Sequence, residues 1–136
     1  MNRFWILAIL LLLPVSASAE WRVVFQSNAG TVHYYDPTRI LSDPPYRTAW
    51  IKSSFAAPRT LADGKQYRSA VQKIVVNCRT EEIAISFSEY FEGANAAEPP
   101  FSKVMRPKEN WEFVPAAPDS EEDFFRSVVC SAAQKP

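Results

Sequence analysis

The chain has 136 residues, with 15 basic and 15 acidic side chains and a formal net charge of zero. This length suits one domain with a single modest core, and the charge balance gives no indication of a nucleic-acid partner. Apolar residues make up 47% of the chain and aromatic residues 13%, which is typical of a folded protein and excludes a disordered one.

The first 19 residues have the pattern of a cleavable secretory signal. Arg3 gives the positive start, residues 4–13 form an unbroken apolar run, and residues 17–19 read Ala-Ser-Ala, a small-residue cleavage site. The apolar run is short for a membrane anchor, and no charged stop-transfer segment follows it. We therefore predict a signal peptide over residues 1–19, cleavage before Glu20, and a mature chain 20–136 that forms one domain without a membrane span.

Five segments of the mature chain are rich in β-branched and aromatic residues and are bounded by turn signals, which is typical of strands. They cover residues 21–27, 31–35, 47–55, 69–79 and 82–91. A sixth strand is expected at either 101–105 or 111–114. The turn signals include Asn-Ala-Gly at 28–30 and Asp-Pro at 36–37.

Alternation assigns faces within two of these strands. In the fourth, one face carries Ala70, Gln72, Ile74, Val76 and Cys78. In the fifth, one face carries Ile83, Ile85 and Phe87, and the other carries Ala84, Ser86 and Ser88. We therefore expect Cys78 to lie beside the apolar side chains of Ile74 and Val76.

The last segment changes from strand to helix periodicity. Asp119 or Ser120 is expected to cap the helix, and the acidic run 121–123 suits its first turn because negative charge is stabilised there. One apolar stripe is formed by Phe124, Phe125, Val128, Val129 and Ala132. On a regular helix Cys130 points away from that stripe. We therefore expect the helix to end or unwind near Val129 if Cys130 is to reach the sheet.

The two cysteines, Cys78 and Cys130, both lie in the exported part of the chain. Exported proteins usually pair such cysteines, and the chain-entropy model gives about 4 kcal/mol for closing a loop of this length. A reactive thiol pair is the alternative, but the sequence has no C-x-x-C motif. We predict an α+β fold: a five- or six-stranded antiparallel sheet, a C-terminal helix packed on one face, and one disulfide between them.

The sequence shows no constellation typical of catalysis. His33 is the single histidine, and Asp36 precedes a proline, where aspartate usually forms a turn. There is no G-x-S-x-G or S-x-x-K motif, no phosphate-binding glycine loop and no zinc-type cluster. We predict a protein that is not an enzyme, with no catalytic, cofactor-binding or metal-binding residues.

Two patterns leave a binding role open. The three tryptophans of the mature chain, Trp21, Trp50 and Trp111, suit either a sugar- or peptide-binding platform or, as we favour, core packing. Residues 47–79 hold seven basic side chains and one acidic one, whereas residues 81–123 hold eleven acidic and three basic ones. We favour pairing of these charges between neighbouring strands. The alternative is a basic face that recruits an anionic partner.

Short motifs follow one another across nearly the whole mature chain. They are Val32-His33-Tyr34-Tyr35-Asp36 with Ile40, Trp50-Ile51-Lys52, Gly64-Lys65-Gln66-Tyr67-Arg68-Ser69, Asn77-Cys78, Trp111-Glu112-Phe113-Val114-Pro115, Pro118-Asp119-Ser120 and Val129-Cys130. This ordered set resembles the surface-adhesin protein E-like domain family of Gram-negative bacteria. The resemblance implies an antiparallel sheet with a cysteine bridge to a C-terminal helix. It also implies an outer-membrane lipoprotein that binds host matrix and plasma proteins and can form a homodimer.

One departure from the family bears on localisation. A bacterial lipoprotein has a cysteine directly after its cleavage site, and that residue is Glu20 here. We therefore expect an exported protein, periplasmic or secreted, that is not lipid-anchored. The resemblance implies a non-enzymatic binding module with a protein partner such as host extracellular proteins. The alternative is a periplasmic envelope accessory protein that docks another chain by its sheet edge.

Overall fold

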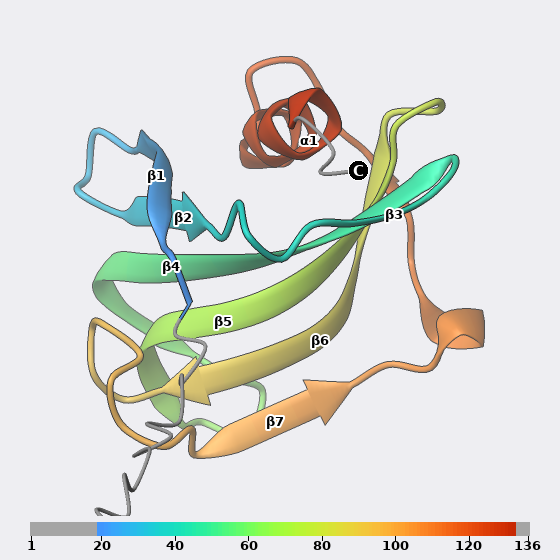
Figure 1. Cartoon of the computed structure of the whole chain (residues 1–136). Coiled ribbons are helices and arrows are strands. Elements are labelled where there is room, and N and C mark those ends of the chain that lie inside the picture. The colour runs from blue at the N-terminus through green and yellow to red at the C-terminus, as the bar shows by residue number, and fades with distance from the viewer. Residues whose placement is uncertain (1–18, 133–136) are drawn as a thin grey trace, which may run out of the picture.

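One antiparallel sheet with a single helix on one face makes up the fold of the computed structural model, which describes residues 19–132 (Figure 1). The predicted signal peptide, residues 1–19, lies outside these residues except for Ala19. The described part of the chain contains eight strands, β1 (Arg22–Gln26), β2 (Val32–Tyr35), β3 (Leu41–Asp43), β4 (Tyr46–Thr60), β5 (Gln66–Asn77), β6 (Glu82–Phe91), β7 (Ser102–Met105) and β8 (Val114–Pro115). A short 3-10 turn, η1 (Lys108–Asn110), and the helix α1 (Glu121–Ser131) complete it.

The strands are ordered β1-β2-β4-β5-β6-β7 across the sheet, with β3 paired to β4 and β8 paired to β6. The predicted α+β class with a C-terminal helix is confirmed, but the sheet has more strands than the five or six expected. Of the two alternative positions for a sixth strand, 101–105 is occupied by β7, whereas β8 shares only Val114 with the segment 111–114. Strands β3 and β8 are three and two residues long, too short for alternation to reveal them.

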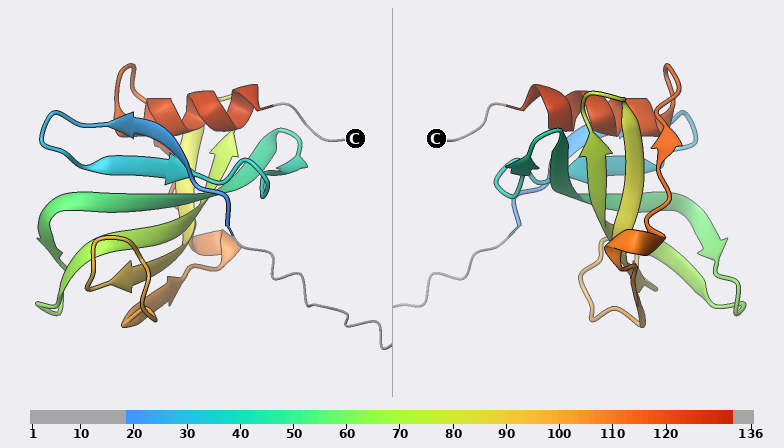
Figure 2. Two further views of the ribbon diagram at one scale, coloured as in Figure 1. Left: turned by 60° about the vertical axis from the view of Figure 1, so that its left-hand side comes forward. Right: turned by 90° about the vertical axis from the view of Figure 1, so that its right-hand side faces the viewer.

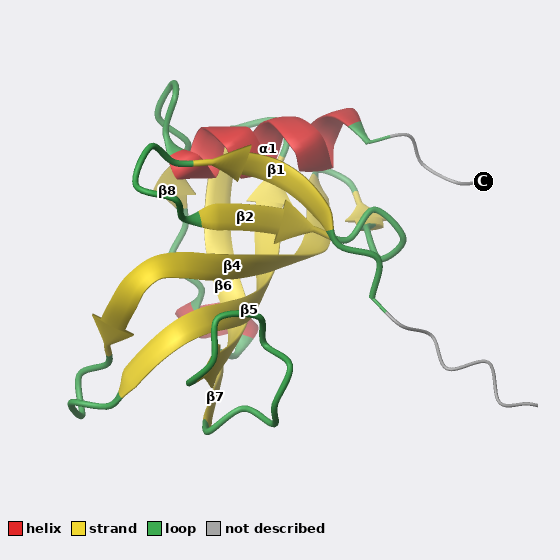
Figure 3. Cartoon of the chain, turned by 90° about the vertical axis from the view of Figure 1, so that its left-hand side faces the viewer, coloured by secondary structure: helices red, strands yellow, loops and turns green. Residues whose placement is uncertain are grey.

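The helix packs on the face of the sheet that we call the helix face. Cross-strand partners on this face include Ala49 opposite Ile74, and Val76 opposite Ile83. These side chains form one buried cluster with the helix, namely Ala49, Ile51, Ile74, Val76, Ile83, Phe125 and Val129. Figure 2 shows α1 as a single layer over the sheet, and Figure 3 shows it running beside β1. Burial of Phe125 and Val129 contributes about 1.5–3 kcal/mol each.

A β-bulge in β6 changes the faces that alternation predicts. The register runs from Lys73 opposite Phe87 to Ile74 opposite Ile85, so Ser86 is an extra residue without a partner. Phe87 therefore lies on the face opposite the helix, whereas Ile85 packs against the core under the helix. The expectation that Ile85 and Phe87 share a face is wrong. The expected face for Ile74 and Val76 is confirmed, with Cys78 packed against the same core.

The helix begins where the sequence predicts. Ser120 is the N-cap, and its Oγ accepts a hydrogen bond from the backbone N–H of Asp123 at 3.2 Å. Phe124 of the expected stripe is 39% exposed and stacks on Phe25 of β1, with 4.6 Å between ring centroids. No helix among residues 19–132 is long and apolar enough to cross a membrane.

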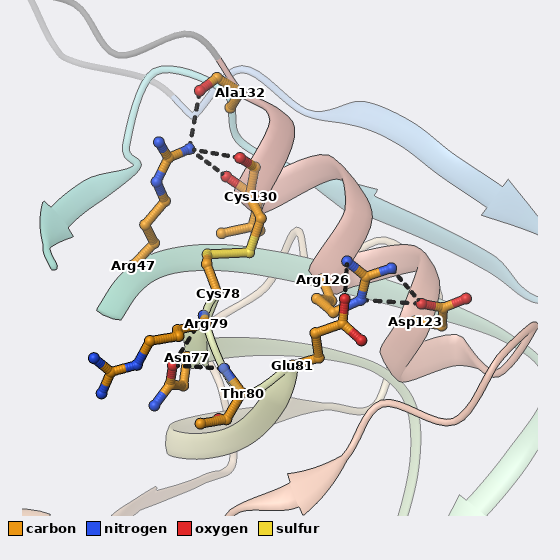
Figure 4. The surroundings of a disulfide bond; sticks show 11 residues. Arg47, Asn77, Cys78, Arg79, Thr80, Glu81, Asp123, Arg126, Cys130 and Ala132 are labelled. Carbon is orange, nitrogen blue, oxygen red and sulfur yellow. Dashed lines mark hydrogen bonds and ion pairs between the residues drawn. A yellow bond between two sulfur atoms is a disulfide. The ribbon is translucent and has the colours of Figure 1, made fainter. Parts of the chain in front are cut away.

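A disulfide joins Cys78 to Cys130, with 5.7 Å between their Cα atoms (Figure 4). The helix continues through Ser131, so the expectation that it would end or unwind near Val129 is wrong. Cys78 lies just beyond the end of β5, at the rim of the sheet, and it reaches the flank of the helix there. Cys130 can therefore bond without turning into the apolar stripe.

Candidate binding surface on the open face

The single histidine, His33, is buried between the sheet and the helix, with 2% of its surface exposed. Its Nδ1 lies 2.8 Å from Ser53 Oγ, and its Nε2 lies 3.3 Å from Glu121 Oε1. Its ring stacks on Phe25 at 4.7 Å between centroids. Burial lowers the pKa of His33, and the nearby carboxylate of Glu121 opposes this shift only in part.

Ser53, His33 and Glu121 are aligned in the order of a nucleophile, a base and an acid. However, the hydroxyl meets Nδ1 and the carboxylate meets Nε2, which is the reverse of the arrangement in serine hydrolases. Ser53 is itself buried, with 5% of its surface exposed, so a substrate has no access to its hydroxyl in this conformation. The arrangement supports a packing role that links β2, β4 and α1.

Asp36 is fully buried and forms the predicted turn after β2. Its Oδ1 accepts from the backbone N–H of Thr38 at 2.9 Å and from Thr38 Oγ1 at 2.5 Å. Its Oδ2 accepts from Arg39 Nε at 2.6 Å. Burial would raise the pKa of Asp36, but the hydrogen bonds from Thr38 and Arg39 outweigh it and hold the pKa below its usual value. Asp36 thus fixes the position of the Arg39 guanidinium.

The face of the sheet opposite the helix, which we call the open face, carries cations over aromatic rings. One row of cross-strand partners runs Val23, Tyr34, Lys52, Val71, Glu89 and Lys103, and the next runs Trp50, Lys73, Phe87 and Met105. At one end this face is covered, because Phe113 packs on Tyr46 at 6.0 Å between ring centroids. The one α-helix of residues 19–132 lies on the other side of the sheet (Figure 2).

Three cations of the open face lie over its aromatic rings. The Arg39 guanidinium is 5.7 Å from the centroid of Trp21 and 5.3 Å from that of Trp50. The Lys52 ammonium is 4.5 Å from the Tyr34 centroid and 5.4 Å from that of Trp21, and burial lowers its pKa. The Lys73 ammonium is 6.0 Å from the Trp50 centroid. These distances are within cation–π range.

The tryptophans are therefore only partly brought together. Trp21 and Trp50 share Arg39 on the open face. Trp111 lies elsewhere and donates from Nε1 to the carbonyl oxygen of Arg106 at 2.8 Å. Two of the three tryptophans of the mature chain, Trp21 and Trp50, thus line a half-buried surface instead of a core.

The expected pairing of charges between strands is wrong. Within residues 19–132, no carboxylate lies within 4.0 Å of the seven basic side chains Arg47, Lys52, Arg59, Lys65, Arg68, Lys73 and Arg79. The register explains this, because Lys52 lies opposite Tyr34 and Val71, and Lys73 lies opposite Trp50 and Phe87. The ammonium groups of Lys52 and Lys73 are therefore not in an ion pair with any carboxylate of the described residues.

The described residues contain no cluster of histidine, cysteine or carboxylate side chains suited to a metal ion. The geometry instead provides an amphipathic surface with positive charge held at fixed positions over rings. Sequence reasoning missed Tyr34, Arg39 and Phe87 as members of this surface, because strand order, the Asp36 turn and the β6 bulge bring them there.

Comparison with known proteins gives one family and one group of solved structures. The family model described as surface-adhesin protein E matches residues 21–131. A structure of Haemophilus influenzae protein E is 15% identical, with 86% of this chain and 88% of that chain covered and a TM-score of 0.56. Protein E from non-typeable Haemophilus influenzae is 15% identical, with 86% and 79% covered and a TM-score of 0.55. At this identity the likeness shows the fold alone. Comparison with curated protein sequences gives no match.

Proposed function

The chain belongs to the surface-adhesin protein E family, and from this we propose that it is an exported, non-enzymatic module that binds host extracellular proteins through its open face. Membership of this family supports an adhesin-like role. The cations and aromatic rings of the open face support binding at that face. The disulfide agrees with an exported protein, because disulfides persist in oxidising compartments.

The single observation that carries this proposal is the unpaired charge of Lys52 and Lys73 over Trp21, Tyr34 and Trp50. Aromatic side chains contribute much of the energy at protein interfaces. A partner carboxylate that meets these ammonium groups would not have to displace an existing ion pair. The open face therefore suits a protein partner with acidic side chains at its surface.

Surface plasmon resonance of the mature protein on immobilised matrix and plasma proteins tests the proposal. Where saturable binding is found, the Lys52→Gln/Lys73→Gln variant should lose roughly tenfold or more in affinity, since each lost tenfold corresponds to about 1.4 kcal/mol. The matched control is Lys65→Gln/Lys108→Gln, which removes the same charge from the β4–β5 loop and from η1. Equal losses in both variants, or no saturable binding at all, would count against the proposal.

Export is part of the same proposal. The mature protein starts at Glu20, carries no lipid, and is periplasmic or secreted. Intact mass measurement of protein recovered from the cell envelope and from the medium tests this. An uncleaved start or an added acyl mass would contradict it.

A second candidate function is an envelope accessory that docks another chain along strand β7, which is an end strand of the main sheet. Val104 of β7 is 39% exposed, and an edge of this kind can accept an added strand. A second copy of the chain docked there would give a homodimer. Val104→Lys should abolish such docking, measured by light scattering and by capture from periplasmic extract, and should leave open-face binding unchanged.

A further inference from the structure

A cavity of about 230 Å³ opens on the helix face, apart from the open face described above. Its floor is apolar and comes from the sheet and the helix, with Ile51, Ile74, Ile83, Ile85 and Phe125. Its charged lining comes from two separate segments. Arg106 and Glu112 lie between β7 and β8, and Glu121 and Glu122 lie in the first turn of α1.

Three carboxylates and one cation, Arg106, line this cavity, so negative charge is in excess. Arg106 has no carboxylate within 4.0 Å in the described part of the chain, and neither Glu112 nor Glu122 takes part in an ion pair there. Glu121 differs, because its carboxylate faces Nε2 of His33. The first turn of a helix favours acidic residues, which accounts for Glu121 and Glu122. It does not account for Glu112, which comes from a different segment and lines the same cavity.

The size and chemistry of the cavity restrict what it can hold. Pockets for drug-sized molecules typically measure about 300–1,000 Å³, so this one suits a single side chain. A purely apolar side chain would bury the carboxylates without a partner, which is unfavourable, and an acidic one would be repelled. A lysine side chain suits both the apolar floor and the acidic lining. Its methylene stem can lie on isoleucine while its ammonium meets the carboxylates.

We propose that this cavity binds a lysine side chain of a partner protein, with the stem on Ile83 and Ile85 and the ammonium between Glu112 and Glu122. The inference rests on the proposed function in one respect, namely that the lysine belongs to a partner protein. The site is separate from Lys52 and Lys73, and it selects the opposite charge.

NMR titration of the oxidised mature protein, with isoleucine methyl labels, tests the inference directly. The probe is lysine blocked at both ends, Nα-acetyl-lysine N-methylamide, and the matched probe is the norleucine analogue, which keeps an apolar stem and lacks the ammonium. The lysine probe should shift the Ile83 and Ile85 methyl signals in a saturable way, at least several-fold more tightly than norleucine. Added salt should weaken the binding.

The variant for this test is Glu112→Gln/Glu122→Gln, which removes both free carboxylates and keeps side-chain volume. It should lose roughly tenfold in affinity for the lysine probe, while the control Glu92→Gln/Glu109→Gln should lose little. Unchanged signal dispersion shows that both variants are folded. Equal binding of lysine and norleucine, shifts confined to other residues, or no saturable shift would overturn the inference.

Failure here is distinguishable from failure of the proposed function. Lys52→Gln/Lys73→Gln should leave binding of the lysine probe unchanged. Conversely, the lysine-probe test of Glu112→Gln/Glu122→Gln gives its result whether or not a host protein that binds the chain is found.

Discussion

Arg47 of β4 donates a hydrogen bond from Nη1 to the carbonyl oxygen of Val129 at 2.8 Å, across 82 positions of sequence. The same nitrogen also lies 3.2 Å and 2.9 Å from the carbonyl oxygens of Cys130 and Ala132 (Figure 4). The last carbonyl groups of a helix have no partner within it, and positive charge is favourable at that end. Arg47 thus caps the C-terminal end of α1 from the sheet.

Replacing Arg47 by alanine should destabilise the protein by about 1–3 kcal/mol, because carbonyl groups at the helix end lose a charged donor. Urea unfolding of the oxidised protein measures the effect. Arg79→Ala is the matched control, since Arg79 is nearby and exposed and its side chain makes no hydrogen bond or ion pair within residues 19–132. An equal effect of both substitutions would contradict a capping role for Arg47.

Loss of the disulfide should loosen the helix before the sheet. Cys78→Ser/Cys130→Ser should cost roughly 2–5 kcal/mol, and hydrogen exchange should rise first in residues 121–131, because an isolated helix of this length is unstable. Thiol titration of the denatured, unreduced wild-type protein should find no free thiol. Two titratable thiols, or uniform exchange across the sheet and the helix, would show that the bridge does not hold the helix.

Asp36→Asn should destabilise the protein by about 1–3 kcal/mol, because a buried carboxylate that accepts from Arg39 is replaced by a neutral amide. Asp43→Asn is the matched control, since both aspartates precede a proline but Asp43 is exposed. Tryptophan fluorescence should also change in Asp36→Asn, because Arg39 is released from Trp21 and Trp50. Similar stability of the two variants would mean that the Asp36 hydrogen bonds contribute little.

His33 should make the protein less stable in mild acid. Its pKa in the folded state is lowered from 6.5, so below pH 6.5 the unfolded chain binds a proton that the folded chain does not. The contribution of neutral His33 to the free energy of unfolding is fully present above pH 6.5. It declines as the pH falls from there toward the folded-state pKa. The urea midpoint should fall more between pH 7.5 and 5 in the wild type than in His33→Gln.

The pKa of His33 can be measured directly by NMR, because it is the single histidine of the chain. Glu121→Gln should lower this pKa further, since Glu121 is the group that raises it, and Arg59, which acts in the other direction, remains. A measured value at or above 6.5 in the wild type would refute the predicted acid sensitivity.

The helix, the longer strands and the disulfide could be predicted because each follows from a local pattern. Periodicity places Phe125 and Val129 inward, and two cysteines in an exported chain allow one pairing. The face of Phe87 could not be predicted, because one extra residue, Ser86, reverses the alternation beyond it.

The open face was also beyond sequence reasoning. Trp21, Arg39 and Lys73 are far apart in the chain and meet only through the order of the strands. Charge counts suggested pairing between strands, but register decides which side chains face one another. It places rings and aliphatic side chains opposite Lys52 and Lys73.

The position of the disulfide also determines how the molecule transmits tension when it is pulled from its two ends. Force entering at β1 passes through β2, β4 and β5 to Cys78, and then crosses directly to Cys130, so the loop of 52 positions between them is not stretched. The fully stretched oxidised chain is therefore shorter than the reduced chain by about 170–190 Å, at about 3.3–3.6 Å per residue. Trp21, Lys52 and Lys73 lie on the stretched path, whereas Glu112 and Glu122 lie within the shielded loop. Tension would therefore deform the open face and the part of the cavity floor that β4 and β5 supply, whereas the segments that carry Glu112 and Glu122 bear none of it.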